Sequence, residues 1–187
     1  MSRKVKVSKE EFAEALLHWV AMHISVEGIK QDAKVLDFVS DSPLESREAK
    51  ELFGLELSNE ERFTILFEEL MPLNLWMVVF TCESKFSNVN QRDHCLDIFH
   101  RRFFDQFLKD TIEDFGQWMH SLGSKYAEYM ETMKTGTGKD LMALAHLIER
   151  NLHDEATPSA ILNLQISLYV GEWMKTLAKV LDQYEIE

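Results

Sequence analysis

The residues best suited to chemistry in this chain are two aspartates and a histidine spaced for one side of a helix. Asp93, Asp97 and His100 are four and three positions apart, so at about 100° per residue they share one helical edge. Carboxylate and imidazole groups at such spacing bring metal ligands into the interior of helical bundles. The pattern also fits packing, because aspartates in a first helical turn complement the helix dipole and a histidine among phenylalanines often has one core hydrogen bond. The three residues are candidate metal ligands, and we favour the packing interpretation.

A second row of possible ligands follows one flank of a helix expected at residues 139–153. His146, Glu149 and His153 form this row, beside an apolar side that includes Leu144 and Ile148. Di-iron carboxylate bundles use Glu-x-x-His on two helices, but this order occurs nowhere in the sequence, and His146-x-x-Glu149 reverses it. We keep the second row as candidate metal ligands and expect the flank to be solvated.

Signatures of other chemistries are missing from the sequence. There is no Gly-x-Ser-x-Gly for a nucleophilic serine. The glycine-rich residues 135–140 lack the first glycine and the final serine or threonine of a phosphate-binding loop. A non-enzymatic protein is therefore favoured, and no particular cofactor is implied.

Capping residues and apolar periodicity predict an all-α fold. Ser8 with Glu11, and Ser58 with Glu61, match the capping box, in which each partner accepts a backbone N–H at a helix start. Together with glycine stop signals, the periodicity predicts helices at residues 9–26, 30–40, 43–53, 59–83, 90–121, 124–134, 139–153 and 158–184. We expect a single domain over residues 1–187, a multi-helix bundle of about six to eight helices, with residues 1–8 as a flexible basic N-terminal arm.

Composition restricts the classes of partner. The 187 residues include 20 basic and 32 acidic ones, giving a net charge of -12, which disfavours nucleic acid because that affinity comes from Lys and Arg. The most apolar run, residues 70–80, is too short for a bilayer span, which needs about 20 residues, so we expect no transmembrane segment. Only two cysteines, Cys82 and Cys95, and no apolar leader region indicate a reducing compartment, and we expect a cytoplasmic protein.

The amount of apolar helical surface gives the leading functional interpretation. The last expected helix, 158–184, is apolar on more than one side, and such a helix is buried by its own chain or by another subunit. We therefore expect an acidic, non-enzymatic protein–protein interaction domain that self-associates, as a possible homodimer, through this helix or residues 70–80. The alternative is a helical pocket protein or metalloenzyme that binds a metal or a small apolar ligand near Asp93, Asp97 and His100.

Overall fold

The computed structural model describes residues 4–24, 60–134, 138–152 and 160–187, and these fold as six α-helices with two short strands. In chain order the elements are β1 (Val5–Val7), α1 (Lys9–Ile24), α4 (Glu60–Lys85), α5 (Val89–Phe103), the π-helical segment η3 (Phe104–Leu108), α6 (Phe115–Thr132), α7 (Gly138–Leu152), α8 (Ala160–Leu181) and β2 (Tyr184–Ile186). The predicted all-α fold class is confirmed. The helices expected at 30–40 and 43–53 lie outside the described residues.

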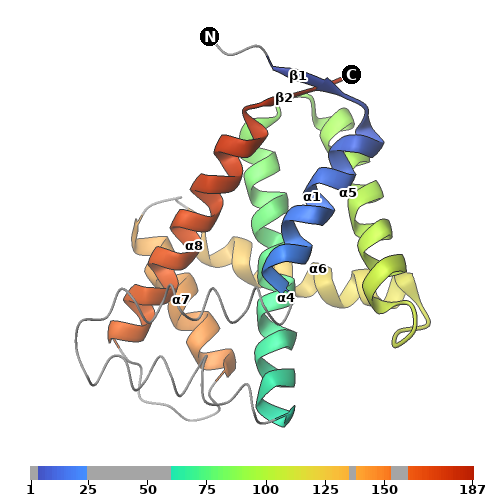
Figure 1. The fold of residues 1–187 in the computed structure, drawn as a ribbon. Coiled ribbons are helices and arrows are strands. Elements are labelled where there is room, and N and C mark those ends of the chain that lie inside the picture. The colour runs from blue at the N-terminus through green and yellow to red at the C-terminus, as the bar shows by residue number, and fades with distance from the viewer. Residues whose placement is uncertain (1–3, 25–59, 135–137, 153–159) are drawn as a thin grey trace.

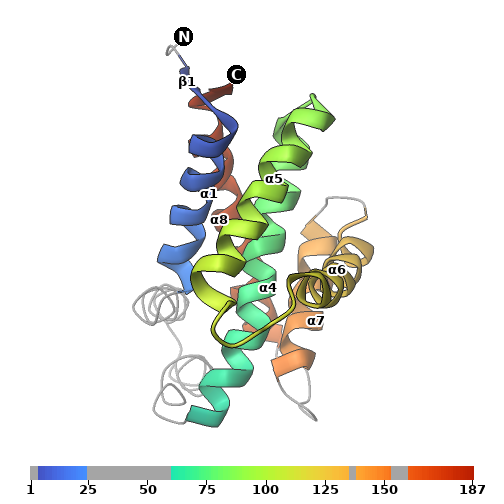
Figure 2. The ribbon, with the colours of Figure 1, turned by 90° about the vertical axis from the view of Figure 1, so that its right-hand side faces the viewer.

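Helix α4 is the centre of the bundle. Among the described residues, it contacts each of the other five α-helices. Helices α1, α5 and α8 run alongside it, and α6 crosses it steeply (Figures 1 and 2). The apolar run predicted at residues 70–80 lies in α4, and Leu73, Trp76 and Met77 have no exposed surface. A helix segment that is apolar on all sides is buried by its neighbours, and this segment of α4 follows that rule.

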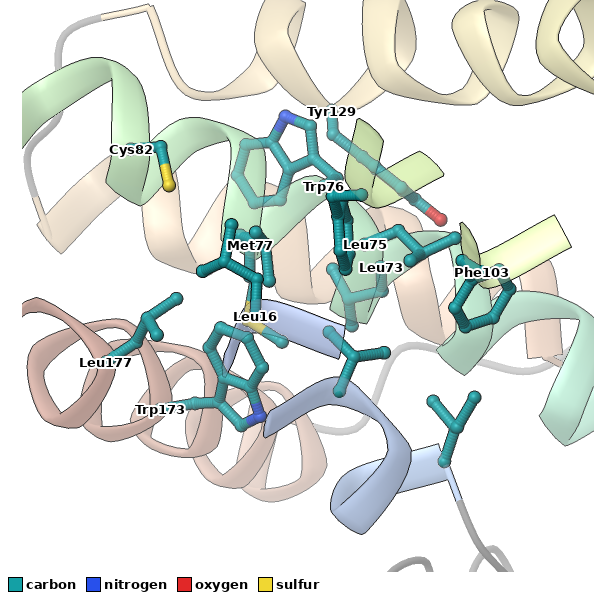
Figure 3. Close-up of a cluster of buried hydrophobic side chains, with 14 of the residues drawn as sticks. Leu16, Leu73, Leu75, Trp76, Met77, Cys82, Phe103, Tyr129, Trp173 and Leu177 are labelled. Carbon is teal, nitrogen blue, oxygen red and sulfur yellow. The ribbon is translucent and has the colours of Figure 1, made fainter. Parts of the chain in front are cut away.

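The buried apolar side chains form one cluster around α4. Its members come from α1, α4, α5, α6, α7 and α8, among other elements, and Figure 3 shows Leu16, Trp76, Phe103, Tyr129 and Trp173 among them. The aromatic members meet at angles that favour attraction between ring edges and faces, for example Trp76 and Tyr129 with centroids 5.5 Å apart at 60°. Within the described residues, no helix has both the length and the apolar character to span a membrane.

The N-terminal segment is more ordered than the sequence predicts. The capping box at the start of α1 is present, because Glu11 N–H donates to Ser8 Oγ (3.1 Å) and Ser8 N–H donates to Glu11 Oε2 (2.8 Å). The flexible arm predicted for residues 1–8 is wrong for residues 5–7, which form β1 and pair in parallel with β2. The alternating valines of β1 suit a strand, but its partner lies at the other end of the sequence, so local reasoning could not find the pairing.

The helix expected at 90–121 is wrong because it is interrupted. Lys109 N–H bonds back five residues to Phe104 carbonyl (2.9 Å), which makes the π-helical turn, and residues 109–114 then leave the helix. Asp114 starts α6 as its N-cap, with its carboxylate accepting from Gln117 N–H at 2.8 Å. Gly123, which separates the helices expected at 90–121 and 124–134, lies inside α6.

Candidate functional site

His100, the central residue of the first candidate edge, is a buried core histidine. Its Nδ1 lies 2.8 Å from the carbonyl of Leu96 and its Nε2 lies 2.9 Å from the hydroxyl of Tyr126. A carbonyl only accepts, so Nδ1 carries the proton and Nε2 accepts from Tyr126. Burial lowers the pKa of His100, outweighing the opposing effects of the Leu96 hydrogen bond and of Asp97. Both ring nitrogens are thus used within the fold, in the neutral state.

The aspartates of this edge lie at the surface. Asp93 is exposed and pairs with Arg92 (2.8 Å), and Asp97 is also exposed. Aromatic rings from α5 and α6 surround His100 instead, with Trp118 and Tyr126 centroids at 6.5 and 5.9 Å. The structure therefore does not bring Asp93, Asp97 and His100 together.

The second row is divided in the same way. His146 is exposed, and its Nδ1 lies 4.0 Å from Oε2 of Glu149. Glu149 is buried, and the same oxygen accepts from the Nδ2 of Asn163 on α8 at 2.6 Å. His153 lies outside the described residues. Among the residues that the structure does describe, no three or more His, Cys, Asp or Glu side chains are grouped so that they could hold a metal ion.

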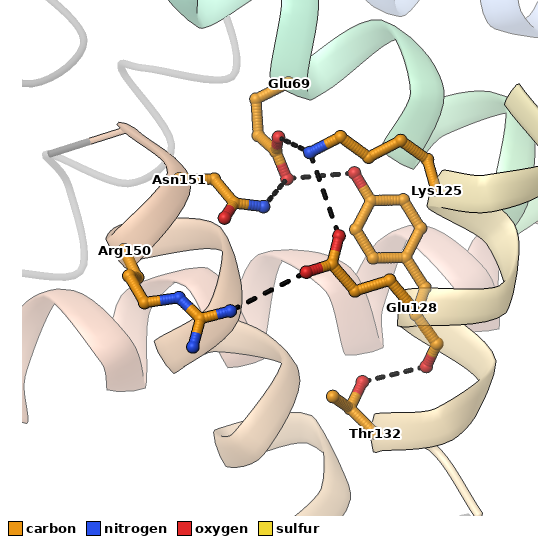
Figure 4. Close-up of polar contacts among 7 residues, drawn as sticks. Glu69, Lys125, Glu128, Thr132, Arg150 and Asn151 are labelled. Atoms are coloured by element: carbon orange, nitrogen blue, oxygen red, sulfur yellow. Dashed lines mark hydrogen bonds and ion pairs between the residues drawn. The ribbon is translucent and has the colours of Figure 1, made fainter. Parts of the chain in front are cut away.

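The most developed polar site is one that the sequence does not reveal, centred on the carboxylate of Glu69 in α4 (Figure 4). Glu69 is only 4% exposed. Its Oε1 accepts from the hydroxyl of Tyr129 (2.9 Å) and from Nδ2 of Asn151 (3.0 Å), and its Oε2 accepts from Nζ of Lys125 (2.8 Å). We call these four residues the Glu69 cluster. The donors come from α6 and α7, so one buried carboxylate joins three helices.

A second layer of charge continues the Glu69 cluster toward the surface. Glu128 lies 3.9 Å from Lys125 within α6 and 3.6 Å from Arg150 of α7. Burial, reinforced by the charge of Glu69 and by the hydrogen bond to it, raises the pKa of Tyr129 far above its usual range. Tyr129 therefore keeps its proton, and its hydroxyl donates a hydrogen bond to Glu69, which suits a structural contact rather than a general base.

The sequence signal for the burial of Glu69 is its position directly before the apolar run at residues 70–80. A residue next to a buried helical run is itself close to the core. The partners Lys125, Tyr129 and Asn151 are 56 to 82 positions away along the chain. Helical periodicity indicates on which side of its own helix a residue lies, but not which residue of another helix it contacts. The sequence patterns therefore could not predict the Glu69 cluster.

The outer side of α8 is apolar at its N-terminal end and charged further along. Leu164 and Leu168, one turn apart, are 51% and 45% exposed, and we call them the leucine pair. Glu172, Lys175 and Lys179 are exposed beyond them, and Glu172 bonds to Lys175 at 2.7 Å. The opposite side of α8, including Trp173 and Leu177, packs into the core (Figure 3).

Comparisons with models of protein families, with curated proteins and with solved structures find no match to this chain. The class that the structure defines is therefore given by the geometry alone. It is an all-α bundle around one central helix, with a closed polar cluster inside and an exposed leucine pair on an outer helix.

Proposed function

We propose that this protein is a non-enzymatic interaction domain that self-associates through the leucine pair of α8. The observation that carries the proposal is the half-exposed state of Leu164 and Leu168 on neighbouring turns. Helical neighbours at i and i+4 form a continuous apolar spot, and an apolar centre with a polar rim is the usual composition of a protein interface. The charged residues beyond the pair supply such a rim.

Local charge also favours α8 as the helix through which two copies associate, and we call this contact the seam. The exposed side of α8 beyond the leucine pair carries two lysines and one glutamate, whereas the whole chain has a net charge of -12. Two copies of an acidic chain repel each other, and the repulsion is weakest where cations lie at the surface. Two leucines are a small apolar centre, so we expect a dimer in concentration-dependent equilibrium with the monomer.

The Glu69 cluster supports the non-enzymatic part of the proposal. Each oxygen of the Glu69 carboxylate has at least one donor from the protein, at 2.8 to 3.0 Å. A carboxylate satisfied in this way stabilises helix packing and has little capacity left to accept a substrate proton.

Exchange of Leu168 for glutamate tests the proposal. Analytical ultracentrifugation over a concentration series should show dimer for the wild type and the 21.8 kDa monomer for Leu168→Glu, because each copy then places an uncompensated carboxylate at an apolar seam. Met130→Glu makes the same change at a 41% exposed methionine on α6 and should leave the dimer intact. Circular dichroism verifies that both variants are folded. A wild type that stays monomeric throughout, or a Leu168→Glu protein with unchanged mass, would contradict the proposal.

A further inference from the structure

We infer that the two copies meet with their α8 helices antiparallel, centred between Leu164 and Leu168, an inference that rests on the self-association proposed above. The leucine pair belongs to a longer stripe on the exposed side of α8. Leu164, Leu168, Glu172, Lys175 and Lys179 follow one another at intervals of four, four, three and four residues. Neighbours at intervals of three and four residues share one side of a helix, and only the first two positions of this stripe are apolar.

A parallel arrangement would use the whole stripe and place like charges together. In a parallel two-fold pair each residue lies opposite its own copy. Glu172 would then oppose Glu172, and Lys175 and Lys179 would each oppose themselves. Like charges at directly opposed positions are destabilising, and parallel alignment also brings the like ends of the two helix dipoles together.

An antiparallel arrangement removes these conflicts and adds an attraction. With the centre between Leu164 and Leu168, Leu164 of one copy lies opposite Leu168 of the other, so all four leucines meet. Position 172 then lies opposite position 160, which is the first residue of α8 and is exposed. The carboxylate of Glu172 would therefore approach the positive N-terminal end of the other α8. Lys175 and Lys179 follow Glu172 and are further from the centre of the contact, so neither lysine lies opposite the same residue of the other copy.

The position of α8 in the fold is compatible with such a contact. It packs against α4 and α7 and forms an outer helix of the bundle (Figure 1). The exposed stripe is on the side away from the core residues Trp173 and Leu177. A second α8 can therefore align with it without displacing the central cluster.

Distances between spin labels on the two copies distinguish the arrangements. Thr176 is ten residues and Lys179 thirteen residues from the proposed centre, and both are exposed. At 1.5 Å rise per residue, antiparallel helices separate the two labels by about 30 Å at position 176 and by about 40 Å at position 179. Parallel helices give nearly equal distances at both positions, each of about 20 Å or less, set by the interaxial spacing.

The experiment uses the full chain with Thr176→Cys or Lys179→Cys, each carrying a nitroxide label. Cys82 and Cys95 are buried, so the native thiols should remain unlabelled, and wild-type protein treated in the same way measures the background. Pulsed dipolar spectroscopy should give the longer distance for position 179. Adding Leu168→Glu should abolish the intermolecular signal.

The outcomes separate the two proposals. Dimers with short and equal distances at the two positions overturn the antiparallel seam and leave self-association standing. Dimers whose signal survives Leu168→Glu place the contact elsewhere and overturn both the seam and the role of the leucine pair. Protein that sediments as a monomer at every concentration overturns the proposed function together with this inference.

Discussion

Glu69 illustrates how a single buried charge is held in this protein. A buried carboxylate needs several charge-assisted hydrogen bonds to offset its loss of hydration, and Glu69 has them from Lys125, Tyr129 and Asn151. Removing one donor leaves the charge in place with less compensation. The cost should therefore exceed that of a hydrogen bond between neutral groups.

Two tyrosines allow this expectation to be measured. Tyr129→Phe removes a donor to the ionised Glu69 and should lower the free energy of unfolding by about 2–3 kcal/mol. Tyr126→Phe removes a donor to neutral His100 and should cost about 1 kcal/mol. Urea titration of both variants gives the comparison. Equal losses would contradict the expectation that the hydrogen bond to the Glu69 carboxylate contributes more than the one to His100.

His100 should make stability depend on pH. Burial holds its folded-state pKa below the ordinary value of 6.5, so the unfolded chain binds the proton first as pH falls. Stability from this group is complete above pH 6.5 and declines as pH falls through 6.5 toward the folded-state pKa. The hydrogen bond to the Leu96 carbonyl and the charge of Asp97 oppose this lowering of the His100 pKa, and burial outweighs both.

The double variant His100→Leu/Tyr126→Phe is the matched control, since it removes the titrating group and leaves no hydroxyl unpaired. Urea midpoints between pH 7.5 and 5.5 should fall more for the wild type than for the double variant. Other histidines titrate in both proteins and cancel in the difference. Identical pH profiles would show that His100 has the same proton affinity in both states.

At the scale of the elements, the sequence is most informative where the signal is local. The capping box at Ser8, the apolar run in α4 and the start of α7 near residue 139 each depend on neighbours a few positions apart, and each lies close to where it was expected. The interruption after Phe103 has no such local signal, because Phe103 and Phe107 keep the four-residue spacing of one helix side through the π-helical turn. Phe103 is nevertheless buried, whereas Phe107 is 38% exposed.

The candidate site shows the same limit more strongly. Helical spacing correctly placed His100 among aromatic rings, but Trp118 and Tyr126 reach it from α6, on the far side of the interruption. Asp93 and Asp97 lie in helix α5 as expected, but both side chains are exposed at the surface. The neighbours of a side chain depend on contacts between helices, which no single-helix pattern contains.

Gly123 provides a test of the continuous α6 helix. A Cβ built at Gly123 meets nothing within 4 Å, and alanine in a helix interior is more stable than glycine because it loses less backbone entropy on folding. Gly123→Ala should raise the free energy of unfolding by about 1 kcal/mol. At Gly116 the added Cβ would lie 3.2 Å from Oδ1 of the capping Asp114, so Gly116→Ala should gain less. Thermal denaturation of both variants decides whether residue 123 is helical, since a loss of stability at 123 would indicate a break there.

At the scale of the whole molecule, one helix organises the rest. Because α4 contacts each of the other α-helices in the described part of the chain, the core and the Glu69 cluster both depend on it. The leucine pair, where we propose that two copies meet, lies on the opposite side of α8 from that core. Changes at the leucine pair should accordingly alter assembly while leaving the packing around α4 unchanged.

The parallel pairing of β1 with β2 has a consequence for how copies would be connected. Lys6 bonds to Glu187, 181 positions away, so both described ends of the chain emerge at one pole of the bundle (Figure 1). In an antiparallel pair of α8 helices, these poles face in opposite directions and lie about 50 Å apart, at 1.5 Å per residue from the centre of the seam. Anything tethered to the chain ends would then be displayed at two separate poles. Such an assembly would act as a bivalent connector, with a span fixed by the length of α8.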